Sequence, residues 1–123
     1  MASSSGRAVV TGKWGERFVE RDLRRRGMEV VERNWRCEHG ELDLVARDGD
    51  MLVVIEVKTR RTQAFGWPEE AVSYEKAQHL RAAGEAYLQH LGWVGPWRID
   101  VASVERNATG DWTVRWFRDA IQG

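Results

Sequence analysis

The stretch "ELDLVARDGDMLVVIEVKTR", residues 41–60, decides the fold. Residues 41–47 alternate apolar with polar or small side chains, which is typical of a strand, and residues 51–58 are almost continuously apolar. The Asp-Gly pair between them is a strong hairpin signal. We therefore expect two antiparallel strands, and we expect the second to lie near the centre of a sheet because both of its faces are apolar.

The segments on either side of this hairpin predict an α/β fold. Val10, Trp14 and Phe18 repeat every four residues and so indicate a first helix. Ser73 is suited to cap a second helix. A mixed sheet packed against helices is the architecture that this order favours. The expected elements are a helix from residue 9 or 10 to 26, strands at 28–35, 41–47 and 51–58, a short helical turn after residue 68, a helix at 74–91, and strands at 97–105 and 112–118.

Length and composition predict one domain. The chain has 123 residues, of which 42% are hydrophobic and 31% charged, as in ordinary soluble globular proteins. We expect a single domain over residues 1–123, with residues 1–6 as a frayed arm. The longest apolar run, "MLVVI", is too short to span a bilayer. With no signal peptide recognised and a single cysteine, Cys37, the sequence predicts a cytoplasmic protein without an internal disulfide.

The charges are balanced overall but unevenly placed. The chain carries 19 Lys and Arg residues against 19 Asp and Glu residues. This balance argues against a generally basic nucleic-acid-binding protein, so DNA would have to bind at a local patch. Basic clusters stand at "RRR", residues 24–26, and at "KTRR", residues 58–61. A solvated surface is the alternative explanation for the first cluster.

Three charged side chains are expected to converge beside the apolar hairpin. Glu56 and Lys58 are two residues apart in a strand and therefore share one face. If Asp48 and Gly49 form the two-residue loop, Asp43 lies diagonal to Glu56, and a shift of two residues would place the two carboxylates directly opposite each other. A plain salt bridge at the end of the hairpin is the structural alternative.

The chemistry of this group favours metal-assisted hydrolysis. Two carboxylates held together repel, and one of them takes up a proton unless a cation relieves the repulsion. Mg²⁺ prefers oxygen ligands, often one or two carboxylates together with water and phosphate. Lys58 would then orient water or stabilise charge in the transition state. The sequence therefore predicts a phosphodiester-cleaving site that uses Mg²⁺ or Mn²⁺.

The spacing of these residues also resembles a known superfamily. Asp43, twelve intervening residues and "EVK" at 56–58 resemble the PD-(D/E)xK, restriction-endonuclease-like nucleases, and "KWGER" at 13–17 is similar to a helix of archaeal Holliday-junction resolvases. The whole chain resembles the small YraN family of bacterial proteins. The segments that carry this resemblance are "GERFVERDLRRRGMEVVERNWR", "GELDLVARDGDMLVVIEVKTR", "EEAVSYEKAQHL" and "RIDVASV", within residues 12–104.

The resemblance implies a restriction-endonuclease-like fold and a role for each matching residue. Asp43 and Glu56 would be metal ligands, with the Val57 carbonyl completing the protein's share, and Lys58 would be the catalytic lysine. Glu16 would reach in from the first helix as a further ligand, directly or through water. Leu42 stands where the superfamily often has a proline. Glu41 lies on the same face as Asp43, where it would either substitute in coordination or remain a surface residue.

The predicted substrate is DNA, with branched or junction DNA as one class in repair or recombination. Arg60 and Arg61 would line the approach to the site together with Arg24 and Arg25, and their phosphate contacts would provide affinity without sequence choice. Lys76 would either contact phosphate or simply cover the edge of the core. The fold resemblance also admits a homodimer. The alternatives are a catalytically silent nucleic-acid-binding module and a protein-interaction module that keep the nuclease fold.

Overall fold

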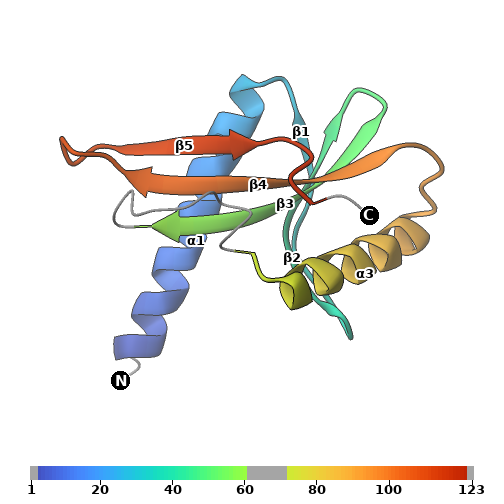
Figure 1. Ribbon diagram of the computed structural model, residues 1–123, viewed down its shortest axis with the longest axis horizontal. Coiled ribbons are helices and arrows are strands. Elements are labelled where there is room, and N and C mark those ends of the chain that lie inside the picture. The colour runs from blue at the N-terminus through green and yellow to red at the C-terminus, as the bar shows by residue number, and fades with distance from the viewer. Residues whose placement is uncertain (1–2, 61–71, 122–123) are drawn as a thin grey trace.

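The computed structural model describes residues 3–60 and 72–121, and the side chains of residues 14–59 and 72–121. The helical turn expected after residue 68 lies outside this part of the chain. The elements follow the predicted helix-strand-strand-strand-helix-strand-strand order, which confirms the α/β fold class (Figure 1). They are α1 (Ser3–Arg25), β1 (Glu29–Cys37), β2 (Gly40–Asp48), β3 (Met51–Arg60), α3 (Tyr74–Leu91), β4 (Trp97–Arg106) and β5 (Trp112–Phe117).

The five strands form one mixed sheet in the order β1-β2-β3-β4-β5. The pairs β1–β2, β2–β3 and β4–β5 are antiparallel, whereas β3 and β4 run parallel because α3 lies between them in the chain. The middle strand is β3, as its apolar sequence predicts. Residues 52–55 of this strand are completely buried, so the hairpin read from residues 41–60 forms the centre of the sheet.

Each face of the sheet carries one helix, and the two helices bury separate cores (Figure 1). On one face, Val19 and Leu23 of α1 pack in a cluster with Val53 and Ile55 of β3. The opposite cluster contains Tyr87 of α3 together with other apolar residues of α3, β2, β3 and β4. Alternate residues of β3 therefore enter different cores, which explains why its sequence is apolar without interruption.

Local sequence signals predict the start of α3 and the end of α1, but not the start of α1. The N-cap of α3 is Ser73, as predicted, and its side-chain oxygen accepts a bond of 3.0 Å from the backbone N–H of Lys76. Gly27 has a φ of 85° just after α1 ends, as expected of a glycine cap. The predicted start of α1 is wrong. This helix begins at Ser3 and includes residues 3–6 of the segment expected to be an arm. An apolar stripe indicates which part of a helix packs against the core, but it does not show how far the helix extends beyond that part.

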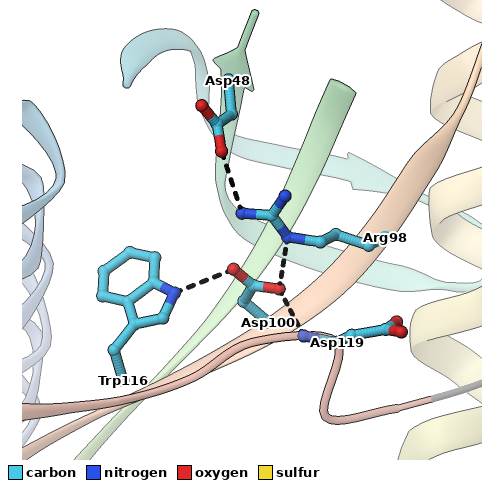
Figure 2. Close-up of polar contacts among 5 residues, drawn as sticks. All are labelled: Asp48, Arg98, Asp100, Trp116 and Asp119. Carbon is cyan, nitrogen blue, oxygen red and sulfur yellow. Dashed lines mark hydrogen bonds and ion pairs between the residues drawn. The ribbon is translucent and has the colours of Figure 1, made fainter. Parts of the chain in front are cut away.

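A buried polar network ties the start of β4 to the C-terminal part of the chain (Figure 2). The Asp100 carboxylate is completely buried and accepts bonds from Arg98 Nε at 2.9 Å and Trp116 Nε1 at 2.8 Å, and from the backbone N–H of Asp119 at 2.7 Å. Arg98 also lies 3.4 Å from Asp48 at the end of β2. A buried ion pair needs such additional bonds to offset its loss of hydration.

Candidate metal-dependent phosphodiester site

The register of the β2–β3 hairpin brings Asp43 beside Glu56. Asp48 pairs with Met51, so the loop residues are Gly49 and Asp50, and the predicted loop of Asp48 and Gly49 is wrong. Gly49 has a φ of 62°, which suits the first position of a two-residue hairpin loop. The last paired residues at the open end of the hairpin are Leu44 and Ile55, one residue before Asp43 and Glu56. The observed register differs from the predicted one by two residues. A shift of two residues keeps each side chain on its face of the sheet, so Asp43 and Glu56 still lie close together.

Asp43 is held against the backbone of β3. Its Oδ2 accepts a 2.9 Å hydrogen bond from the backbone N–H of Val57. The pKa of Asp43 is raised to about 7, first by burial and then by the charges of Glu56, Glu16 and Glu41, while the Val57 bond acts in the opposite direction. A carboxyl group in this environment is near half-protonated at neutral pH.

Glu56 is the most deeply buried carboxylate of the site. Its side chain is 5% exposed, and its Oε2 lies 3.5 Å from the ammonium groups of both Lys58 and Lys76. Its other oxygen, Oε1, is buried and has no hydrogen-bond partner in the described part of the chain. A buried carboxylate oxygen that lacks a partner is costly, so this atom marks a place where a further donor or a cation would bind favourably.

Lys76 therefore belongs to the site, because it contacts Glu56. Its position in the sequence had suggested either a contact with phosphate or a lysine that covers the edge of the core. It lies in the first turn of α3, where the helix dipole disfavours a cation. The Ser73 cap fixes this turn through the backbone N–H of Lys76. Contact with Glu56 offsets the unfavourable position, which explains why a lysine stands there.

Glu16 approaches from α1, as the sequence predicts, but it is held by another residue. Asn34 of β1 donates a 2.9 Å bond from Nδ2 to Glu16 Oε1, and the Glu16 charge helps to raise the pKa of Asp43. The neighbouring Gly15 allows α1 to lie close to β3. A Cβ atom at this position would stand 2.5 Å from Thr59 Oγ1, so a larger residue would require the Thr59 side chain or the helix to shift.

The donor set fits one hard divalent cation. Asp43 and Glu56 offer carboxylate oxygens, one of them unpartnered in the described residues. The pKa of Asp43 is raised by burial and, after that, by the charge of Glu56, and a cation would favour the ionised form of both groups. Among the residues that the structure describes, no group of three His, Cys, Asp or Glu side chains is positioned to hold an ion. A cation bound here would thus depend on water and substrate oxygens for the rest of its shell, which is how Mg²⁺ commonly binds.

The remaining predicted residues fall in different places. Glu41 is half-exposed and lies 3.7 Å from Arg36, so it contributes charge near Asp43 from the surface. Arg24 and Arg25 are exposed on the outer side of α1. Arg61 and the side chain of Arg60 lie outside the described residues.

Sequence reasoning missed a polar group on β4 and β5 beside Lys58. Ser103 pairs with Lys58 across the parallel strands. Its hydroxyl donates a 2.8 Å bond to the completely buried Glu105, which also lies 3.3 Å from Arg115. The available signal was the two-residue spacing of Ser103 and Glu105, which places both on one face of the strand, as for Glu56 and Lys58.

Comparison with known proteins identifies the family of this chain. Residues 15–104 match the sequence model of the uncharacterised protein family UPF0102. The chain belongs to this family. UPF0102 proteins that resemble it include those of Beutenbergia cavernae, 52% identical over 80% of this chain and 85% of the relative, and Nocardioides sp., 45% identical over 89% and 91%. A more distant UPF0102 protein, from Pseudomonas syringae pv. syringae, is 37% identical over 89% of this chain and 91% of its own length.

The matched region contains every element that builds the site, from the second half of α1 through most of β4. The YraN-type membership inferred from the sequence motifs is thereby confirmed. In the described residues, no helix combines the length and the apolar character needed to cross a membrane.

Proposed function

We propose that this UPF0102 protein is a divalent-metal-dependent phosphodiesterase that hydrolyses the DNA backbone, with branched or junction DNA as its preferred class. The observation that supports this most directly is the meeting of two carboxylates, Asp43 and Glu56, at the Val57–Lys58 end of the central strand. The pKa of Asp43 is raised to about 7, and Glu56 leaves one buried oxygen without a partner in the described residues. Both features favour a cation at this point.

The residues of the candidate site would have different roles in hydrolysis. Asp43 and Glu56 would hold the cation, with Glu16 acting directly or through water. A divalent cation supplies polarisation of a phosphoryl oxygen and makes water a better nucleophile. The ammonium of Lys58, 3.5 Å from Glu56, would stabilise negative charge that develops on the phosphate. Because Asp43 must lose its proton to bind the cation, metal affinity should rise as the pH increases through about 7.

The direct test is a cleavage assay on four DNA substrates: a four-way junction, a flap, a single strand and a duplex, each with Mg²⁺, Mn²⁺ or chelator. The parent protein should cleave at least one substrate in metal. Lys58→Ala should reduce the rate by about 100-fold, the usual effect of losing a group that stabilises transition-state charge. Arg118→Ala, which removes an exposed cation elsewhere, is the matched control. Absence of metal-dependent cleavage on every substrate would refute the proposal.

A catalytically silent nucleic-acid-binding module is the second candidate, and one observation favours it. Lys58 and Lys76 already place two ammonium groups 3.5 Å from Glu56, so the site is partly neutralised without a metal. In that case DNA would bind equally well in chelator and in metal, and no substrate would be cut. A chain that binds no DNA at all but retains a protein partner would instead indicate an interaction module.

A further inference from the structure

A strongly basic groove runs along α1 next to β1. The hollow has a volume of about 600 Å³, and five arginines and one glutamate line it. The chain as a whole carries equal numbers of basic and acidic residues, so this concentration of one sign is a local feature. The lining residues are Arg17, Glu20, Arg21, Arg24, Arg25 and Arg33.

Three of these arginines form a stripe with no acidic partner. Arg17, Arg21 and Arg25 follow one another at intervals of four residues on α1, and all three are exposed. In the described residues none of them lies in an ion pair. Like charges at this spacing repel along a helix, so the stripe weakens the helix unless an anion binds it. Successive positions are about 6 Å apart along the helix axis.

The wall of the groove is fixed by Glu20. Its carboxylate lies 2.7 Å from both Arg24 and Arg33, and the hydrogen bond from Arg33 lowers the pKa of Glu20. One half-buried acid thus holds two guanidinium groups at the edge of the groove while it neutralises a single charge. The arrangement keeps the groove basic and limits the motion of two of its cations.

The lining of the groove includes sequence neighbours of Glu16 and Asn34. Arg17 follows Glu16 on α1, and Arg33 precedes Asn34 on β1, while Asn34 and Glu16 are joined by a hydrogen bond of 2.9 Å. From Arg17 to Arg25 the helix covers about 12 Å. One strand of B-DNA advances about 3.4 Å per nucleotide, so the groove matches roughly three to four nucleotides.

The other side of the stripe offers aromatic surface. A second hollow of about 260 Å³ includes Arg21 and Arg25, and it is also lined by Phe18 and Trp112. Trp112 is half-buried, and its ring centroid lies 5.0 Å from that of Trp14, which is 37% exposed. Arginines interleaved with aromatic rings are typical of single-stranded nucleic-acid binding, in which phosphates meet cations and bases stack on rings.

We propose that Arg17, Arg21 and Arg25, supported by Arg24 and Arg33, bind the phosphate backbone of a single-stranded segment of nucleic acid and direct it to the site at Asp43 and Glu56. The proposal rests on the proposed function in taking a nucleic acid as the substrate. It does not depend on whether the site is catalytically active, because phosphate binding by arginine requires no metal.

The test measures binding of a labelled single-stranded oligonucleotide by fluorescence anisotropy in chelator, at several salt concentrations. The triple variant Arg17→Ala, Arg21→Ala, Arg25→Ala should bind about tenfold more weakly or worse, and the slope of log affinity against log salt should fall by about 2. The matched control replaces three exposed arginines elsewhere, Arg47, Arg106 and Arg118, with alanine and should leave affinity within about twofold. Circular dichroism verifies that both triple variants are folded.

Several outcomes separate this proposal from hydrolysis itself. If the groove variant loses binding while the parent cleaves no substrate, the groove proposal is supported and the proposed hydrolysis is refuted. If both triple variants weaken binding equally, or if the groove variant binds and cleaves like the parent, the groove proposal is overturned. Groove-dependent binding of poly-glutamate or of anionic vesicles, without binding of the oligonucleotide, would also overturn it.

Discussion

Asp43 combines two unfavourable conditions at a single residue. It is a carboxyl group removed from much of its hydration, and it lies near the charges of Glu56, Glu16 and Glu41. These effects raise its folded-state pKa from an ordinary value of 3.8 to about 7. The Val57 N–H bond offsets only part of this penalty. A residue that destabilises its own fold at neutral pH is more readily explained by a bound cation than by a structural role.

The pH dependence of this penalty has a definite sign. Below about pH 4 Asp43 is protonated in both the folded and unfolded states, so it carries no penalty. Between about pH 4 and pH 7 the folded state retains the proton that the unfolded state releases, so the free energy of unfolding falls as the pH rises. Above about pH 7 the full penalty is present.

Asp43→Asn should therefore stabilise the protein in chelator, and by more at high pH. We expect the free energy of unfolding to increase by about 1–3 kcal/mol at pH 8, because asparagine keeps an acceptor for the Val57 N–H without the charge, and to change little at pH 4. Urea denaturation of both proteins at the two pH values measures this. Asp50→Asn, at an exposed turn position, is the control. A gain that is the same at both pH values would contradict the assignment.

At the scale of elements, two glycines set how closely the helices lie on the sheet. Gly15 brings α1 against Thr59 of β3, next to the candidate site. Gly84 does the same for α3 on the opposite face, where an added Cβ would stand 2.5 Å from Cζ3 of the Trp97 ring. Glycine is a poor helix former, so its presence inside both helices indicates that close packing outweighs helix propensity here.

Gly84→Ala should destabilise the protein, although alanine is the better helix former. The gain in propensity is about 1 kcal/mol, whereas forcing the Trp97 ring to move should cost about 1–3 kcal/mol or more, so we expect a net loss of about 0–2 kcal/mol. Thermal or urea unfolding measures the change. In a Trp97→Leu background the clash is removed, and the same substitution should become neutral or stabilising. Stabilisation by Gly84→Ala in the parent background would show that α3 does not pack this closely.

At the scale of the whole molecule, the site joins three elements that are far apart in the sequence: the β2–β3 hairpin, α1 and α3. Glu56 receives Lys58 from its own strand and Lys76 from α3. Glu16 of α1 contributes charge from the other helix. A cation that binds the folded protein and not the unfolded chain should therefore stabilise the entire assembly by mass action.

Mg²⁺ or Mn²⁺ should raise the melting temperature of the parent protein. A cation at 100 times its dissociation constant contributes about 2.7 kcal/mol. Asp43→Asn and Glu56→Gln should each abolish most of this gain, whereas Asp50→Asn should retain it. Differential scanning fluorimetry at pH 8, across a series of metal concentrations, measures the shift. Equal shifts in all four proteins would indicate that the cation binds elsewhere.

The sequence by itself determined the α/β class, the element order and the position of β3 at the centre of the sheet, because hydrophobic periodicity and capping residues are local signals. It also determined that Asp43 and Glu56 meet, since an error of two residues in register leaves every side chain on its face. The start of α1 was not predicted, because no packing pattern marks that boundary. The hairpin loop was not predicted either, since it consists of Gly49 and Asp50 rather than Asp48 and Gly49.

Only the tertiary structure decided which distant side chains complete the site and the surfaces around it. That Lys76 contacts Glu56 depends on how α3 crosses the sheet, and that Asn34 holds Glu16 depends on the packing of α1 beside β1. The arginine groove likewise combines one helix face with Arg33 of a neighbouring strand. These contacts follow from the placement of whole elements against one another, and local periodicity carries no record of that placement.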